Sequence, residues 1–105
     1  MKYIQIFTTA GSKTEAEKIA KLLVTKKLAA CVQIVGSIKS FYRWKGKIES
    51  AKEWLCIIKS ETGKYSAIEK AIKPIHSYET PEIIAMPIST GSKDYLSWLR
   101  EGLRK

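Results

Sequence analysis

The stretch of residues 31–60 reads as two long β-strands joined by a two-residue turn at Lys45-Gly46. At about 3.3 Å per residue, the first arm, residues 31–44, would be roughly 45 Å long. A compact domain of this length has a radius of gyration near 13 Å, which corresponds to a globule only about 33 Å across. The hairpin is therefore predicted to project beyond the body of its own chain.

The far end of this hairpin is apolar. It carries Phe41, Tyr42 and Trp44 before the turn, Ile48 after it, and Trp54 further along the return arm. A soluble monomer rarely exposes a patch of this kind, so we expect these five residues to lie in subunit contacts. A head-to-tail contact of a hairpin on a sheet edge must close into a ring, which favours a homotrimer over a two-fold dimer.

Length and composition indicate one domain over residues 1–105, with 45% hydrophobic and 28% charged residues. No apolar run approaches the roughly 20 residues of a membrane span, and the N-terminus enters a strand pattern directly. These observations predict that the chain has no membrane partner and a cytoplasmic location.

The formal charge of +9 comes from 19 basic and 10 acidic residues. Such a balance favours polyanions, whether nucleic acid, acidic lipid or a phosphorylated small molecule. The lysines are spread along the whole chain, however, which is typical of a solvated surface. The chain has no Asn and only two Gln, and lysine enrichment with few thermolabile amides is a pattern of proteins from hot environments.

The two cysteines are predicted to be free thiols. A two-residue turn pairs Trp44 with Lys47, which places Cys31 opposite Ser60 on the return arm. Cys56 then lies four residues away, about 13 Å along the strand. That separation is too large for a disulfide, and free thiols are expected in a reducing compartment.

Alternating and helical hydrophobic patterns predict the order β-α-β-β-α-β followed by a last helix. This order is the ferredoxin-like split unit, an α+β sandwich with both inner helices on one face of a four-stranded antiparallel sheet. Gly36 is the expected bulge in the long hairpin. The predicted elements are a strand at 3–7, a helix from 13 to about 27, the hairpin at 31–60, a helix from about 64 that Pro74 stops, a strand at 82–88, and a helix after Ser92.

The first helix begins with a capping box, Ser12 to Glu15, in which each side chain would bond the backbone amide of the other residue. Its predicted buried stripe consists of five apolar residues. These are Ala16, Ile19, Ala20, Leu23 and Val24.

No enzyme signature is present: the chain lacks a P-loop and the G-x-S-x-G, H-E-x-x-H and C-x-x-C motifs. We therefore expect a protein that is not an enzyme. The loop of residues 76–79 is the candidate site, with Cys31 and Lys59 as possible neighbours. Imidazole, thiolate and carboxylate ligands favour copper or zinc over magnesium. The same residues have an alternative interpretation without a metal. His76 and Glu79 would then be an ordinary pair on the surface, and Cys31 would be a small apolar residue of the core.

Three segments together resemble the CutA divalent-cation tolerance proteins. They are A-A-C-V at 29–32, S-F-Y-R-W-K-G-K-I-E at 40–49 and H-S-Y-E-T-P-E-I at 76–83. The resemblance implies tight trimers with interlocked long strands, and cytoplasmic proteins linked to tolerance of copper and other divalent ions. Matched by position, the resemblance implies that Cys31, His76 and Glu79 are the candidate metal ligands. It also implies a cleft between subunits lined by Tyr42, Trp44, Lys59 and Tyr78.

Three residues depart from the family pattern: Gln33 replaces a usual Asn, Ser60 a usual Thr, and Ser77 a usual Pro. The last change is expected to loosen the loop that carries His76. The departures leave the overall match intact, because it covers essentially the whole chain in the right order.

These observations predict a non-enzymatic homotrimer that binds copper or another divalent cation at or near clefts between subunits. One alternative is a trimer resembling the PII signalling proteins, with a small anionic effector in the clefts. Another is a basic module that stacks single-stranded nucleic acid. Specific nucleic-acid binding is disfavoured, since the aromatic residues lie at the hairpin tip instead of the sheet centre. An acylphosphatase-type enzyme would need an arginine in the loop of residues 8–12, which has none.

Overall fold

The computed structural model describes residues 2–104. Its element order is β-α-β-β-α-β with a last helix, as predicted. Single turns of 3-10 helix at Thr62–Lys64 and Lys73–Ile75 flank the second helix. The main elements are β1 (Tyr3–Ala10), α1 (Lys13–Thr25), β2 (Cys31–Trp44), β3 (Lys47–Glu61), α2 (Tyr65–Ile72), β4 (Ile84–Pro87) and α3 (Lys93–Gly102).

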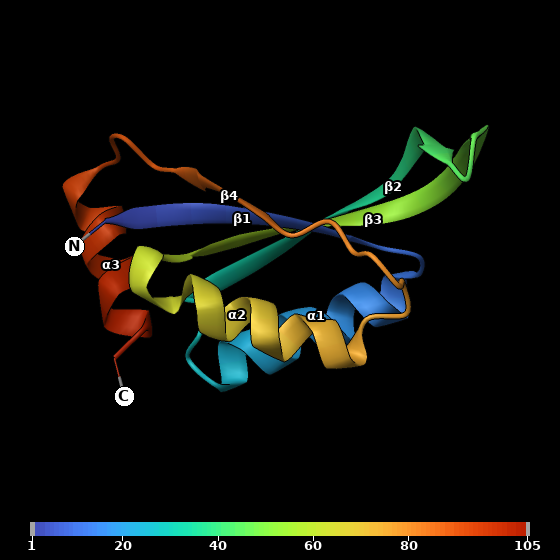
Figure 1. The fold of residues 1–105 in the computed structure, drawn as a ribbon. Coiled ribbons are helices and arrows are strands. Elements are labelled where there is room, and N and C mark those ends of the chain that lie inside the picture. The colour runs from blue at the N-terminus through green and yellow to red at the C-terminus, as the bar shows by residue number, and fades with distance from the viewer. Residues whose placement is uncertain (1, 105) are drawn as a thin grey trace.

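The strands form one antiparallel sheet in the order β2-β3-β1-β4. Helices α1 and α2 lie side by side under one face of this sheet, and α3 packs at the end near both chain termini (Figure 1). The core lies between the sheet and the two helices, and the predicted α+β fold is confirmed. Its fully buried large residues are Ile6, Ile19, Leu23, Ile58, Ile68 and Ile72.

The buried stripe of α1 is narrower than predicted. Ala16, Ile19 and Leu23 are fully buried, but Val24 is 44% exposed. The prediction for Val24 was wrong because consecutive helical residues are about 100° apart, which turns Val24 away from the line through Ile19 and Leu23. No helix within the described residues is long and apolar enough to cross a membrane.

The hairpin of β2 and β3 contains the predicted irregularity at Gly36, where the strand register shifts by one residue. Trp44 pairs with Lys47 as expected, but Cys31 lies opposite Lys59 and not Ser60. The predicted pairing was wrong because the bulge adds one residue to β2 between the turn and Cys31. Both cysteines are free, as predicted.

Together, β2 and β3 extend beyond the body of the chain and curve away from it at their far end (Figure 1). The molecule is accordingly elongated, with principal extents of 44 × 25 × 22 Å. Phe41 and Ile48 are 69% and 72% exposed near the turn, and Tyr42 and Trp44 are also exposed. Trp54 differs from these four residues, because it is partly buried against the core of its own chain.

Candidate functional site

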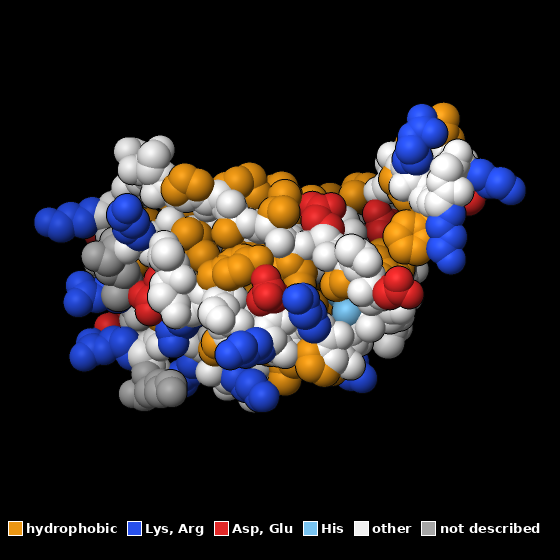
Figure 2. Space-filling view, in the orientation of Figure 1, with side chains coloured by type: hydrophobic (Ala, Val, Ile, Leu, Met, Phe, Trp, Pro, Cys, Tyr) orange, Lys and Arg blue, Asp and Glu red, His pale blue; other side chains and the backbone are white. Residues whose placement is uncertain are grey.

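A cavity of about 610 Å³ lies where the hairpin meets the body of the molecule. Its walls come from the end of β1, from both hairpin strands and from the loop between α2 and β4. Acidic side chains gather at this junction (Figure 2). The lining residues are Thr9, Ser40, Phe41, Tyr42, Trp44, Glu53, Tyr78, Glu79, Thr80 and Glu82.

His76 anchors the loop beneath this cavity. The side chain is buried, and its Nδ1 accepts a hydrogen bond of 3.1 Å from the amide of Tyr78. Because Nδ1 accepts, the proton resides on Nε2, which donates to the carbonyl oxygen of Thr9 at 2.8 Å. Both ring nitrogens are therefore engaged within the chain, and the imidazole fixes the loop to the end of β1.

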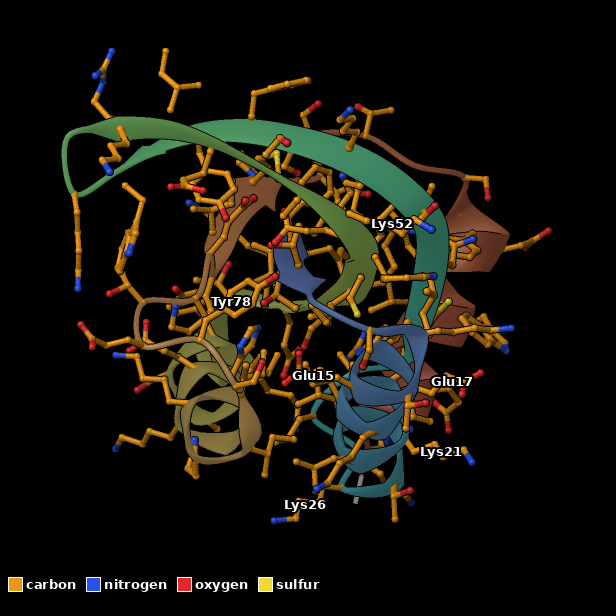
Figure 3. The ribbon with its side chains drawn as sticks, turned by 90° about the vertical axis from the view of Figure 1, so that its right-hand side faces the viewer. Glu15, Glu17, Lys21, Lys26, Lys52 and Tyr78 are labelled. Carbon is orange, nitrogen blue, oxygen red and sulfur yellow. The ribbon has the colours of Figure 1, made fainter. Side chains whose placement is uncertain are left out.

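Glu15 holds the same loop from the first turn of α1. Its Oε2 accepts from the Ser77 amide at 2.8 Å, and its Oε1 accepts from the Ser77 hydroxyl at 3.1 Å and from the Gly11 amide at 3.2 Å. Figure 3 shows Glu15 pointing from α1 toward the loop that carries Tyr78. Burial alone would raise the pKa of Glu15, but the hydrogen bonds from Ser77 and Gly11 outweigh it and lower the pKa.

This arrangement alters two predictions. The capping box is half formed, because Ser12 Oγ accepts from the Glu15 amide at 3.1 Å while the carboxylate bonds Gly11 and Ser77 instead of Ser12. The expectation that Ser77 loosens the loop was wrong. A proline at this position would have no amide hydrogen to donate, whereas Ser77 donates both its amide and its hydroxyl.

Tyr78 connects the loop to β3. Its hydroxyl donates a hydrogen bond of 2.8 Å to Oε2 of Glu53, which is only 7% exposed. Burial raises the pKa of Tyr78 far above its ordinary value, and the hydrogen bond to Glu53 and the charge of that carboxylate raise it further. The ring packs closely over Gly11, where an added Cβ would lie 3.3 Å from the Tyr78 hydroxyl oxygen.

The structure brings four of the predicted site residues to one cavity: Tyr42, Trp44, Tyr78 and Glu79 all line it. His76 lies beneath it, with its ring turned inward to Thr9.

The remaining two, Cys31 and Lys59, are cross-strand neighbours near the other end of the sheet, where Lys59 Nζ donates to Gln33 at 2.8 Å. Lys59 also pairs with Gln5 of β1, four residues or roughly 13 Å along the strand from Thr9. Within residues 2–104 no three His, Cys, Asp or Glu side chains gather as a metal site.

Three acidic residues of this site were absent from the sequence prediction. Glu53 and Glu82 line the cavity, and Glu15 supports its loop. The sequence offered one signal for Glu53, which is a carboxylate beside the apolar run of residues 54–58 on a predicted strand. Glu15 was identified only as a capping residue.

The charge of the cavity is opposite to that of the chain. Its charged lining residues are the three carboxylates of Glu53, Glu79 and Glu82, with neither Lys nor Arg among the described lining residues, although the whole chain carries +9. A site of this sign concentrates cations and repels anions. The cavity therefore does not support the alternative of a small anionic effector.

A model of the CutA1 divalent ion tolerance protein family matches residues 4–102. The divalent-cation tolerance protein CutA of Archaeoglobus fulgidus is 50% identical over 96 residues, which cover 91% of this chain and 93% of that protein. A solved structure of the periplasmic divalent cation tolerance protein CutA from Archaeoglobus fulgidus matches with a TM-score of 0.94 at 47% identity, covering 97% of this chain and 99% of that one. CutA1 from Oryza sativa matches with a TM-score of 0.96 at 37% identity, over 100% of this chain and 96% of that one.

The predicted cytoplasmic location is contradicted by the Archaeoglobus fulgidus structure, which is described as periplasmic. The prediction was wrong because hydropathy reports on membrane insertion and does not identify the aqueous compartment in which a chain works. The relatives are named as tolerance proteins, and no enzyme family is indicated among these matches. From the match over nearly its whole length, we conclude that the chain belongs to the CutA1 divalent ion tolerance protein family.

Proposed function

We propose that this chain acts in divalent-cation tolerance as a homotrimer that binds copper or another divalent cation at contacts between its subunits. The family and the names of its relatives support the link to divalent cations. The proposed activity is binding, without catalysis. The β-α-β-β-α-β order agrees with a ferredoxin-like unit whose open sheet face and hairpin are available for assembly.

The proposal of a homotrimer is supported mainly by the exposed tip of the hairpin. Phe41, Tyr42, Trp44 and Ile48 are each more than 40% exposed, and together they form an apolar end on a projecting ribbon. Covering such side chains with sister chains removes apolar area from water, which favours association by about 25 cal/mol per Å². We retain these four residues as subunit contacts and assign Trp54 mainly to packing within its own chain.

The metal would be held by side chains that remain available in the folded chain. Cys31 offers a free, half-buried thiol and Glu79 an exposed carboxylate. A homotrimer contains each of them three times, so groups from different chains can complete a coordination shell. To bind a metal, His76 would first have to give up its hydrogen bond to the Thr9 carbonyl oxygen or the one from the Tyr78 amide. We therefore assign it the role of fixing the loop.

Copper titration by calorimetry tests this proposal. Cys31→Ser and Glu79→Gln are each expected to weaken Cu²⁺ binding by roughly tenfold or more, because each removes a ligand. Glu17→Gln, an exposed acidic residue of α1, is the matched control and should bind as the wild type does. Identical isotherms for the wild type and both ligand variants would contradict the assignment.

A further inference from the structure

The layer formed by α1 and α2 with their flanking residues carries many of the lysines of the chain. Although lysines occur along the whole sequence, folding brings eight of the 19 basic residues onto this layer, in residues 13–27 and 62–75, together with three of the 10 acidic ones. Seven of the eight are exposed and Lys64 is half-buried, and basic side chains are visible over the layer in Figure 2. We call these eight residues the lysine face: Lys13, Lys18, Lys21, Lys26, Lys27, Lys64, Lys70 and Lys73.

The three glutamates of the layer do little to neutralise the lysine face. The Glu15 carboxylate is turned to the loop after α2, where it accepts hydrogen bonds from Ser77. Glu69 forms a salt bridge of 3.4 Å with Lys73, which is the one salt bridge of this layer within residues 2–104. Glu17 is the one exposed acidic residue of the layer. A face with this excess of positive charge attracts a partner that presents many negative charges together.

The lysine face lies on the side of the sheet that the proposed assembly does not use. Helices α1 and α2 cover one face of the sheet, whereas the proposed subunit contacts involve the hairpin and the opposite face (Figure 1). Figure 3 shows Lys21 and Lys26 pointing from α1 away from the sheet. The lysine face is therefore exposed in a single chain and in the proposed homotrimer, and an inference from it does not depend on the metal site.

The residue types of this layer indicate which polyanion it fits. Lysine is a hydrated point charge on a flexible stem, and it attracts phosphate groups without the fixed geometry of arginine. No aromatic side chain is exposed in the two segments, so a nucleic-acid base finds no ring on which to stack. Clusters of about four to eight basic residues on a helix are typical of proteins that bind anionic lipids.

Val24 favours a lipid surface over a nucleic-acid duplex. Its side chain is 44% exposed, and it lies one helical turn from Lys21 and shortly before Lys26. An apolar side chain among lysines gains from entering the boundary between lipid headgroups and acyl chains. The phosphate backbone of a duplex offers it no comparable apolar environment.

We propose that the lysine face binds the surface of an anionic lipid bilayer, with its ammonium groups at the headgroup phosphates and Val24 at the boundary with the acyl chains. The attraction is electrostatic, so added salt screens it and a bilayer without net charge does not provide it. The inference goes beyond the metal proposal, since it concerns another partner and another face of the molecule.

Sedimentation of the assembled protein with lipid vesicles tests this proposal. The wild type is expected to bind vesicles of phosphatidylglycerol and phosphatidylcholine in equal parts at about 50 mM salt, and to bind roughly tenfold or more weakly to phosphatidylcholine alone. Raising the salt to about 500 mM should release it from the anionic vesicles. Equal binding to both kinds of vesicle, or no binding to the anionic vesicles, would overturn the proposal.

The double variant Lys18→Gln with Lys21→Gln removes two charges from the lysine face and should lower the affinity for anionic vesicles by roughly tenfold or more. Lys93→Gln with Arg100→Gln is the matched control, because it removes the same charge from exposed positions of α3. The control should bind anionic vesicles nearly as the wild type does. Unchanged melting temperatures will verify that both variants fold, and an equal loss of affinity in both would overturn the assignment to the lysine face.

Val24→Thr and a DNA duplex separate a lipid partner from a nucleic acid. Val24→Thr keeps the shape of the side chain but makes it polar, so it should lower the affinity for anionic vesicles by a few-fold. Titration of the wild type with a duplex of about 24 base pairs at the same salt concentration provides the comparison. Binding of the duplex by a wild type that does not bind the anionic vesicles would reject the lipid surface in favour of nucleic acid. An unchanged affinity of Val24→Thr for the vesicles would contradict the contact with lipid.

Discussion

The hydroxyl of Tyr78 donates a hydrogen bond of 2.8 Å to Oε2 of Glu53, and this bond joins the loop after α2 to the hairpin. It is the one hydrogen bond that the buried carboxylate makes within the described residues. Because it links segments 25 residues apart in sequence, it fixes one wall of the cavity relative to another.

Tyr78→Phe removes this bond and leaves Glu53 buried without a donor. We expect the free energy of unfolding to fall by about 1–3 kcal/mol, the usual cost of an unsatisfied buried polar group. Urea unfolding measures the change. Tyr3→Phe is the control, since Tyr3 is a half-buried tyrosine at the start of β1 and takes no part in the Tyr78–Glu53 hydrogen bond. An equal loss of stability in both variants would show that the Tyr78–Glu53 hydrogen bond does not account for it.

Glu15 is expected to make stability depend on pH in the acid range. Its pKa is lower in the folded chain than in the unfolded one, because the hydrogen bonds from Ser77 and Gly11 outweigh burial. Its contribution is therefore fully present above the unfolded value of about 4.3 and is lost as the pH falls through the folded pKa. The melting temperature of Glu15→Gln should lie below that of the wild type at pH 7, and the gap should narrow below pH of about 4. A gap that stays constant with pH would contradict this account.

The two cysteines should differ in reactivity. Burial raises the pKa of Cys56 to about 11, and the thiol donates to the Ala16 carbonyl oxygen inside the core. Any thiol labelled by iodoacetamide in the folded protein at pH 7.5 should therefore be Cys31, as peptide mass mapping would show. Labelling that persists unchanged in Cys31→Ser would contradict the burial of Cys56.

Gly36 should not tolerate a side chain. A Cβ at this position would overlap Cδ1 of Trp54, so Gly36→Ala must displace the indole or the bulge. We expect a loss of about 1–3 kcal/mol or more in the free energy of unfolding, the usual range for overpacking. Gly63→Ala is the matched control, because an added Cβ there meets nothing within 4 Å. Equal melting temperatures for the two variants would contradict the close packing of Trp54 against Gly36 in the folded protein.

Trp44→Ala tests the proposed covering of the hairpin tip. Truncating a buried aromatic residue costs about 3–5 kcal/mol, so the variant should dissociate or melt at a clearly lower temperature. Lys47→Ala, at the cross-strand neighbour of Trp44, should keep the wild-type mass and melting temperature. Size-exclusion chromatography with light scattering measures both, and a wild-type mass for Trp44→Ala would argue against its place in a subunit contact.

Local patterns were sufficient to predict most of the fold. The turn at Lys45-Gly46, the bulge at Gly36 and the cap at Ser12 each depend on residues close in sequence, and all three are present. The predicted partner of Cys31 was wrong by one residue. The prediction counted residues from the turn as if the two strands paired without interruption, and it did not include the shift that the bulge at Gly36 causes.

The candidate site was harder to predict, because its contacts join distant segments. Glu15 and Ser77 are 62 residues apart, and His76 and Thr9 are 67 apart. The His-x-x-Glu spacing suggested a shared role, but the His76 ring turns inward to Thr9 while Glu79 is exposed on the cavity wall. A loop has no regular repeat of backbone angles, so the sequence pattern does not indicate in which direction its neighbouring side chains point.

The covering of the projecting hairpin by sister chains is the claim on which the proposed intersubunit metal site depends. Native mass spectrometry of the purified wild type, combined with sedimentation equilibrium at micromolar concentration, measures the number of chains in the assembly. A homotrimer gives one species with three times the 11.9 kDa mass of the chain, and this is the expected result. A single species of 11.9 kDa under both conditions would contradict it.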